Sequence, residues 1–312
     1  MAALAAAAET NGPEPARQAL ADTWWTGPIL AASAGTLPTG HVLIEPYLFD
    51  VMSHGRFDDQ GNRQSVAHGH YVGSLTYMLY GLTDRVTVGM IPTFAWRYGA
   101  NGGSSGIGVG DLQLQGQVRL TQFREGRPVP TVSLVVGETL PTGRYDRLDG
   151  QPNDGFGSGV HTTTVSVYSQ HYFWMPSGRV LRTRLDLSYA FSDTAHLEDT
   201  SVYGTTSGFR GSAQPGNSFV ADLAFEYSVT RNWVLALDIA HNYSANTQVH
   251  GQYLDGRPVR ADSRSSRALY LAPAVEYNFN GNVGIIVGAR VMPDGRNTTQ
   301  TVTPVAAINM VY

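Results

Sequence analysis

Beyond Gly40 the chain alternates repeatedly between apolar and polar residues, in stretches of about ten residues. In residues 111–120 the odd positions are polar, from Asp111 to Arg119, and the even positions are apolar apart from Gly116. The same alternation recurs in residues 86–96, 181–191, 219–228, 233–239 and 269–279. A period of two puts successive side chains on opposite faces of a strand, so the pattern predicts an all-β fold.

The connections between the expected strands alternate in length. Long connections are expected at residues 53–67, 97–107, 140–157, 192–217, 244–266 and 293–300. Short connections are expected at residues 81–85, 123–128, 175–179, 230–232 and 280–282. Long loops on one side and short turns on the other are typical of bacterial outer-membrane barrels, so we expect a closed antiparallel transmembrane β-barrel of about twelve strands. The short turns would lie in the periplasm and the long loops outside the cell.

Composition narrows the alternatives. Only 15% of residues are charged, against a usual share of about 25%, and this sparse, mixed polar face fits a narrow lumen better than the wet face of a soluble β-sandwich. Cysteine is absent, which excludes disulfides, thiolate metal sites and thiol nucleophiles. A net charge of −4 does not indicate the positively charged surface that binds nucleic acid. The chain has no apolar run long enough for a membrane helix, so crossing a membrane requires a closed barrel.

The two ends of the chain differ in character, and we divide it into an N-terminal segment (residues 1–36) and a barrel (residues 37–312). Residues 1–12 are rich in alanine and are interpreted as the remnant of an export signal peptide, with a short exposed helix as the alternative. The rest of the N-terminal segment predicts a periplasmic segment or a small plug. The last strand alternates up to Tyr312, a terminal aromatic typical of outer-membrane barrels and linked to their insertion machinery.

Several short motifs occur in a characteristic order. They are Leu37-Pro38-Thr39-Gly40-His41 leading into Ile44-Glu45-Pro46-Tyr47, then Tyr80-Gly81-Leu82-Thr83-Asp84-Arg85, Gly108-Val109-Gly110-Asp111-Leu112, Leu140-Pro141-Thr142-Gly143 and Gly157-Ser158-Gly159. From about Leu37 to Tyr312 the chain therefore resembles the outer-membrane transporter family named for the meta-pathway of phenol degradation. The resemblance implies a bacterial outer-membrane barrel and suggests a channel associated with the degradation of aromatic compounds. It does not identify a solute.

The ionisable residues of the polar faces are expected to point into the lumen. They are Glu45, Asp111, Asp186, Asp222, Glu226, Asp238, Glu276, Arg119, Arg182, Arg184 and Arg290. Such charges must be paired or hydrated, because isolated burial costs several kcal/mol. One interpretation is a salt-bridged network that stiffens the wall. The other is a constriction that orients a polar or aromatic solute, in which Arg182 and Arg184 meet a carboxylate or stack on a ring.

Metal and enzyme sites are weaker candidates. His68 and His70 near His54, and the acidic loop 146–154, contain oxygen and nitrogen ligands without a fixed spacing. A lipid hydrolase would need a His and a Ser two residues apart on the lipid face near the outer leaflet, whereas Ser169 and His171 are expected at the periplasmic end. We therefore expect a non-enzymatic outer-membrane channel for passive diffusion of small molecules, without metal or cofactor, in contact with outer-membrane lipid and the insertion machinery. A non-conducting structural barrel and a lipid hydrolase are the alternatives.

Overall fold

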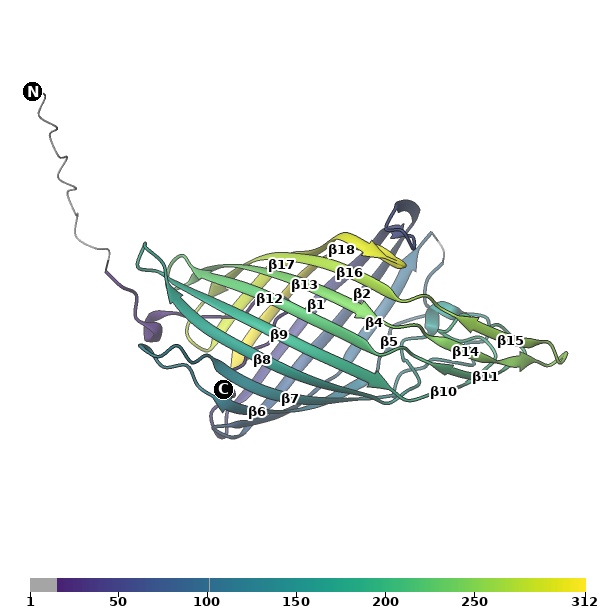
Figure 1. The fold of residues 1–312 in the computed structure, drawn as a ribbon, viewed down its shortest axis with the longest axis horizontal. Coiled ribbons are helices and arrows are strands. Elements are labelled where there is room, and N and C mark those ends of the chain that lie inside the picture. Colours follow the sequence, from purple (N-terminus) through teal and green to yellow (C-terminus); the bar gives the residue numbers. More distant parts are fainter. Residues whose placement is uncertain (1–15, 101) are drawn as a thin grey trace, which may run out of the picture.

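The computed structural model describes residues 16–100 and 102–312, so the interpretation of residues 1–12 as a signal remnant lies outside the described residues. Two sheets contain all the strands, and the larger one forms the wall of the barrel (Figure 1). Its strands are β1 (Val42–Phe57), β2 (Arg63–Thr83), β3 (Val86–Ile91), β4 (Thr93–Gly99), β5 (Gly108–Val109), β6 (Leu112–Thr121), β7 (Thr131–Leu140), β8 (Thr162–Trp174), β9 (Val180–Ser192), β12 (Ser218–Ser228), β13 (Trp233–Ser244), β16 (Ser266–Asn278), β17 (Val283–Arg296) and β18 (Thr298–Val311).

The wall closes on itself because β1 pairs antiparallel with both β2 and β18. Within the described residues, β3 and β4 form one wall strand that is interrupted at Pro92, which has no backbone N–H to donate. The two-residue β5 only extends an edge, so the barrel has 12 wall strands, all antiparallel to their neighbours. The expected fold class is confirmed. No helix within the described residues is long and apolar enough to cross a membrane.

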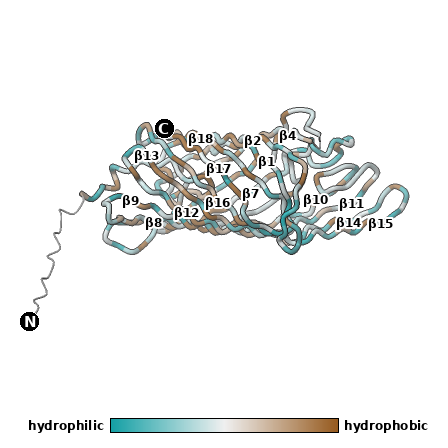
Figure 2. Tube along the Cα trace, turned by 90° about the horizontal axis from the view of Figure 1, so that it is seen from above, coloured by the Kyte–Doolittle hydropathy of each residue, from teal (hydrophilic) through white to brown (hydrophobic). Residues whose placement is uncertain are grey.

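Along each wall strand, the period-two pattern places alternate side chains on the lipid-facing and the lumen-facing surface. Leu235 is 52% exposed on the outer surface, whereas its neighbours Val234 and Ala236 point inward and are buried. Figure 2 shows that apolar residues follow the body of the barrel and polar ones gather at its extracellular end. Trp233 and Tyr277 lie side by side near the periplasmic ends of β13 and β16, with ring centroids 4.7 Å apart. Such outward aromatic rings are typical of the membrane interface.

Two long connections form a second sheet outside the membrane, which projects from one end of the barrel (Figure 1). Its strands are β10 (Ala195–Glu198), β11 (Phe209–Gln214), β14 (Gln248–Tyr253) and β15 (Pro258–Asp262). Two other expected long loops are shorter than predicted. Residues 53–67 are mostly strand, and β17 and β18 meet at Asn297 within the expected loop 293–300. These strand ends project beyond the membrane and are polar on both faces, which hides the alternation.

The extracellular sheet has a hydrophobic core of its own, centred on the buried ring of Phe209. This ring packs across the directly paired Gly211 and Gly251, at positions where an added Cβ would clash with it. We expect Phe209→Ala to destabilise this sheet by roughly 3–5 kcal/mol, because the substitution leaves a cavity in a small core. Limited proteolysis should then cut residues 193–217 and 245–265. Heat-modifiable migration of the barrel on a gel should stay unchanged, and its loss would contradict an independently folded sheet.

Candidate functional site in the barrel lumen

The N-terminal segment runs inside the barrel. At the periplasmic end the Trp174 indole donates to the Gln18 carbonyl, and the Gln18 amide donates to the carbonyl of Gly178. At the other end of the segment, the backbone amide and the hydroxyl of Thr39 donate to Asp84 in the periplasmic turn between β2 and β3, and they lower the pKa of this carboxyl. Residues 23–37 between these anchors, called here the lumenal segment, form a loop that rises from the periplasmic end into the barrel and returns.

Acidic side chains of the wall accept hydrogen bonds from the rising arm of the lumenal segment (residues 26–32). Glu276 accepts from the amides of residues 26 and 27 at 2.7 and 3.1 Å. Asp238 accepts from those of residues 29 and 31, each at 3.0 Å, and Asp186 from that of residue 32 at 2.7 Å. The segment has no regular secondary structure to satisfy its backbone, and unpaired buried amides are costly, so these carboxylates fix its path.

The buried Glu226 on β12 binds both arginines of β9. Its carboxylate accepts from Arg182 through two nitrogens and from Arg184 Nε at 3.0 Å. Arg184 also donates to the Ala31 carbonyl at 2.8 Å, and the Arg182 guanidinium lies 4.4 Å from the ring centroid of Trp25. The network that joins the two strands therefore holds the lumenal segment as well.

The opposite side of the wall binds the returning arm of the lumenal segment (residues 33–37). Gln117 donates to the Ser33 carbonyl at 2.9 Å, and Ser133 donates to the Ala34 carbonyl at 2.6 Å. The small residues of the sequence Ala-Ala-Ser-Ala-Gly (residues 31–35) let the backbone approach these side chains closely. Gly27 has a φ of +124°, a backbone conformation that other residues rarely adopt, so this position of the segment favours glycine.

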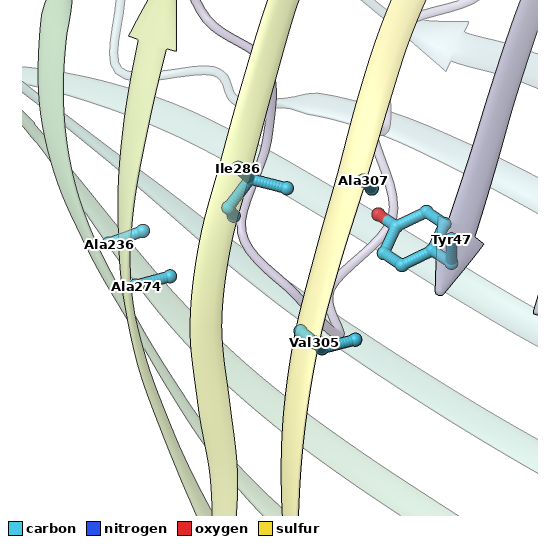
Figure 3. Packing of buried hydrophobic residues seen from close by; sticks show 6 residues of the cluster. All are labelled: Tyr47, Ala236, Ala274, Ile286, Val305 and Ala307. Carbon is cyan, nitrogen blue, oxygen red and sulfur yellow. The ribbon is translucent and has the colours of Figure 1, made fainter. Parts of the chain in front are cut away.

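Ile29 anchors the rising arm through apolar contacts. It packs on a cluster of inward side chains from β1, β13, β16, β17 and β18, which Figure 3 shows as Tyr47, Ala236, Ala274, Ile286, Val305 and Ala307. Most of these side chains are small, which leaves room inside the barrel for the segment to lie against the wall.

Several cavities adjoin the lumenal segment, and one of about 300 Å³ at the periplasmic end is lined by Trp25 and Arg119. The inner cavity, of about 330 Å³, lies toward the periplasm and is lined by Glu45, Arg182 and Arg184. The outer cavity, of about 220 Å³, lies toward the extracellular ends of the strands and is lined by Asp186, Asp222 and Arg290. Tyr77 and Tyr168 line both cavities. These volumes are large enough for small molecules.

The remaining charged candidates lie apart from this centre. Asp111 is at the extracellular end of the wall, where it accepts hydrogen bonds from the Gly143 amide and from the amide and hydroxyl of Ser158. Arg119 lies at the periplasmic end, beside Trp25. The lumen charges therefore divide into a central set around the lumenal segment and two residues at the ends of the barrel.

Some lumenal groups are missing from the sequence-based set. The side chains that face the lumen but are absent from that set are Tyr77, Tyr168, Gln117 and Ser133. Each occupies a strand position that alternates with lipid-facing residues, so the period of two could have identified it. The backbone groups of residues 26–35 could not have been found, because a segment without periodicity gives no sign of where it lies.

The weaker candidates have other contacts. Asp149 is paired with Arg144, and Asp154 accepts hydrogen bonds from Ser105. His171 packs between Phe123 and Phe173 on the outer surface near the periplasmic end of β8. Among residues 16–100 and 102–312, no group of three or more His, Asp or Glu side chains lies close enough to hold a metal ion.

Comparison with known proteins agrees with this architecture. The structure is similar to the COG4313 outer-membrane channel from Pseudomonas putida F1, with a TM-score of 0.65 and 17% identity over 90% of this chain and 98% of that one. It is more distantly similar to the β domain of the Bordetella autotransporter Brka, with a TM-score of 0.47 and 10% identity over 88% and 100% of the two chains. No curated protein matches the sequence.

A protein-family model matches residues 55–303, which is most of the chain and nearly the whole barrel wall. Its description is "Putative MetA-pathway of phenol degradation". The matched range agrees with the motif resemblance that begins near Leu37. The chain thus has the fold of a bacterial outer-membrane β-barrel and belongs to the family that this description names.

Proposed function

We propose that this protein is a passive channel for small molecules across the outer membrane. The observation that carries the proposal is that the lumenal segment does not fill the barrel. It leaves an inner and an outer cavity with volumes of about 330 and 220 Å³, and both are lined by Tyr77 and Tyr168. A mixed polar and aromatic lining of this kind favours hydrated or aromatic solutes over ions alone.

The solute class we propose includes small aromatic compounds. The description of the family refers to phenol degradation, and the related Pseudomonas structure is described as a channel. Tyr77, Tyr168 and Tyr270 line the outer cavity, where their rings can stack on a flat solute while their hydroxyl groups meet its polar substituents. Passage would be driven by the concentration gradient, with the lumenal segment limiting solute size.

Purified protein in a planar bilayer tests this function. Discrete current steps, together with swelling of proteoliposomes in small solutes such as phenol, support a channel. Absence of both would instead favour the second candidate, a non-conducting structural barrel, which the occupancy of the lumen centre by residues 23–37 also fits. Denatured protein added to the same bilayer is the control for leaks.

The arginines of β9 should influence ion selectivity if solutes pass through the inner cavity. Replacing both in Arg182→Ala/Arg184→Ala leaves the buried acidic groups without their cations, and we expect a shift toward cation selectivity, because rings of acidic residues favour cations. Reversal potentials under a salt gradient measure the shift. Arg147→Ala, which removes an arginine from an exposed ion pair outside the barrel, is the matched control. Equal selectivity in both variants would remove Arg182 and Arg184 from the conducting path.

A further inference from the structure

The outer cavity contains two charged groups of opposite sign that do not bind each other. Asp222 on β12 is 4% exposed, and its Oδ1 has no hydrogen-bond partner. Arg290 on β17 has an unpartnered Nε, and its guanidinium lies 4.7 Å from the ring centroid of Tyr270. No ion pair joins either side chain to another within the part of the chain that the structure describes. Both charges line the same cavity.

The strand pairing explains why the two charges do not meet. Asp222 is paired with Ala240 on β13, which is in turn paired with Tyr270 on β16, and Arg290 is one strand further on. Three strand spacings put the backbones of Asp222 and Arg290 roughly 14 Å apart along the wall. Of the two inward residues in this row, Ala240 is too short to fill the space, and the Tyr270 ring lies against Arg290.

Of the neighbouring charges, Arg184 has its partners in Glu226 and the Ala31 carbonyl. Asp186, which is paired with Asp222 across the strands, accepts from the Ala32 amide through Oδ2, while its Oδ1 has no hydrogen-bond partner. The buried Oδ1 of Asn242 also lines this cavity and has no partner, which adds an acceptor beside the acidic end. The site therefore has an acidic end, with Asp222, Asp186 and the Asn242 oxygen, and a basic end at Arg290. Leaving both ends without a partner costs free energy that a complementary ligand would recover.

We propose that the outer cavity is a binding site for a small zwitterion, with its ammonium group on Asp222 and Asn242 and its carboxylate on Arg290. A molecule with one charge satisfies only one end and leaves the other desolvated. The tyrosine rings between the two ends fit a short alkyl or aromatic spacer. That this ligand is a transported solute rests on the proposed channel function, but binding itself does not require conduction.

Calorimetry on the full chain in detergent tests the site with a series of ω-amino acids. The probes are γ-aminobutyrate, δ-aminovalerate, ε-aminocaproate and 4-(aminomethyl)benzoate, and butylamine and butyrate are the singly charged controls. We expect one spacer length to bind at least about tenfold more tightly than either control. Asp222→Asn should lower the affinity for that zwitterion to the level of butyrate, and Arg290→Gln should lower it to the level of butylamine.

Arg260→Gln, on an exposed position of β15, is the matched control variant and should bind like the unaltered protein. Heat-modifiable migration on a gel confirms that each variant is folded. The proposal is wrong if no zwitterion binds more tightly than the singly charged probes, or if folded Asp222→Asn and Arg290→Gln bind like the unaltered protein. Conduction without zwitterion binding would overturn the site but leave the channel, whereas binding without conduction would support the site and overturn the channel.

Discussion

Deleting residues 20–35 is expected to raise single-channel conductance about fivefold or more, because a barrel of this strand number has an interior wider than its side chains alone can fill. The deletion removes the chain that occupies the centre of the lumen and leaves Asp186, Asp238 and Glu276 to bind water. Conductance in planar bilayers under identical salt measures the effect.

Two comparisons make this result specific. Asp238→Ala/Glu276→Ala removes the acceptors for four backbone amides, so it should give brief openings of the same large size while the segment is still present. Deleting residues 200–206 from the extracellular loop between β10 and β11 should leave conductance nearly unchanged, since that loop lies outside the membrane. If removal of residues 20–35 leaves the conductance of a folded barrel unaltered, the lumenal segment does not obstruct the path.

Glu226→Gln is expected to destabilise the barrel by roughly 3–5 kcal/mol, which is the usual cost of removing one partner from a buried ion pair. Glu226 is 0% exposed, and its carboxylate is the common partner of Arg182 and Arg184. The neutral amide leaves two buried guanidinium groups facing each other. Urea titration in detergent, followed by the heat-modifiable gel shift, measures the free energy of unfolding.

An exposed ion pair provides the control for this prediction. Arg147 and Glu198 pair in the extracellular region with about half or more of each side chain exposed, and Glu198→Gln should change stability by no more than about 1 kcal/mol. The triple variant Arg182→Met/Arg184→Met/Glu226→Met should regain much of the loss, because a buried network can be replaced by apolar groups of similar volume. Equal stability of Glu226→Gln and the unaltered protein would mean that water reaches these charges.

The wall of the barrel could be predicted from sequence because a membrane imposes the period of two on each strand. Leu112, Leu185 and Leu235 face outward, as the alternation requires, and the alternating loop lengths give the strand count. The period disappears where the strands leave the membrane, so the sequence predicts loops at residues 53–67 and 293–300, where the structure has hairpins. The extracellular sheet was missed for the same reason, since its strands are short and its outer face is polar.

Only those residues of the candidate site that belong to the barrel wall could be predicted from the sequence. The parity of β9, β12, β13 and β16 identifies the inward charges, including Arg182, Glu226 and Asp238. Their partners are backbone amides and carbonyls of residues 26–35, and a sequence pattern describes side chains only. Sequence alone therefore identifies the charges but not the chain that many of them bind. The role of these residues in orienting a solute stays a prediction.

The central claim is that the lumenal segment lies inside the barrel against the inward faces of β13 and β16. The protein has no cysteine, so a pair of introduced cysteines is free of background thiols. Ile29 packs against the buried cluster that includes Ala236, whereas Leu235, next to Ala236 in the sequence, faces lipid. In intact outer membranes, a short bifunctional thiol reagent should cross-link Ile29→Cys/Ala236→Cys efficiently and Ile29→Cys/Leu235→Cys hardly at all. Equal cross-linking of the two pairs, or none in either, would contradict a segment held within the lumen.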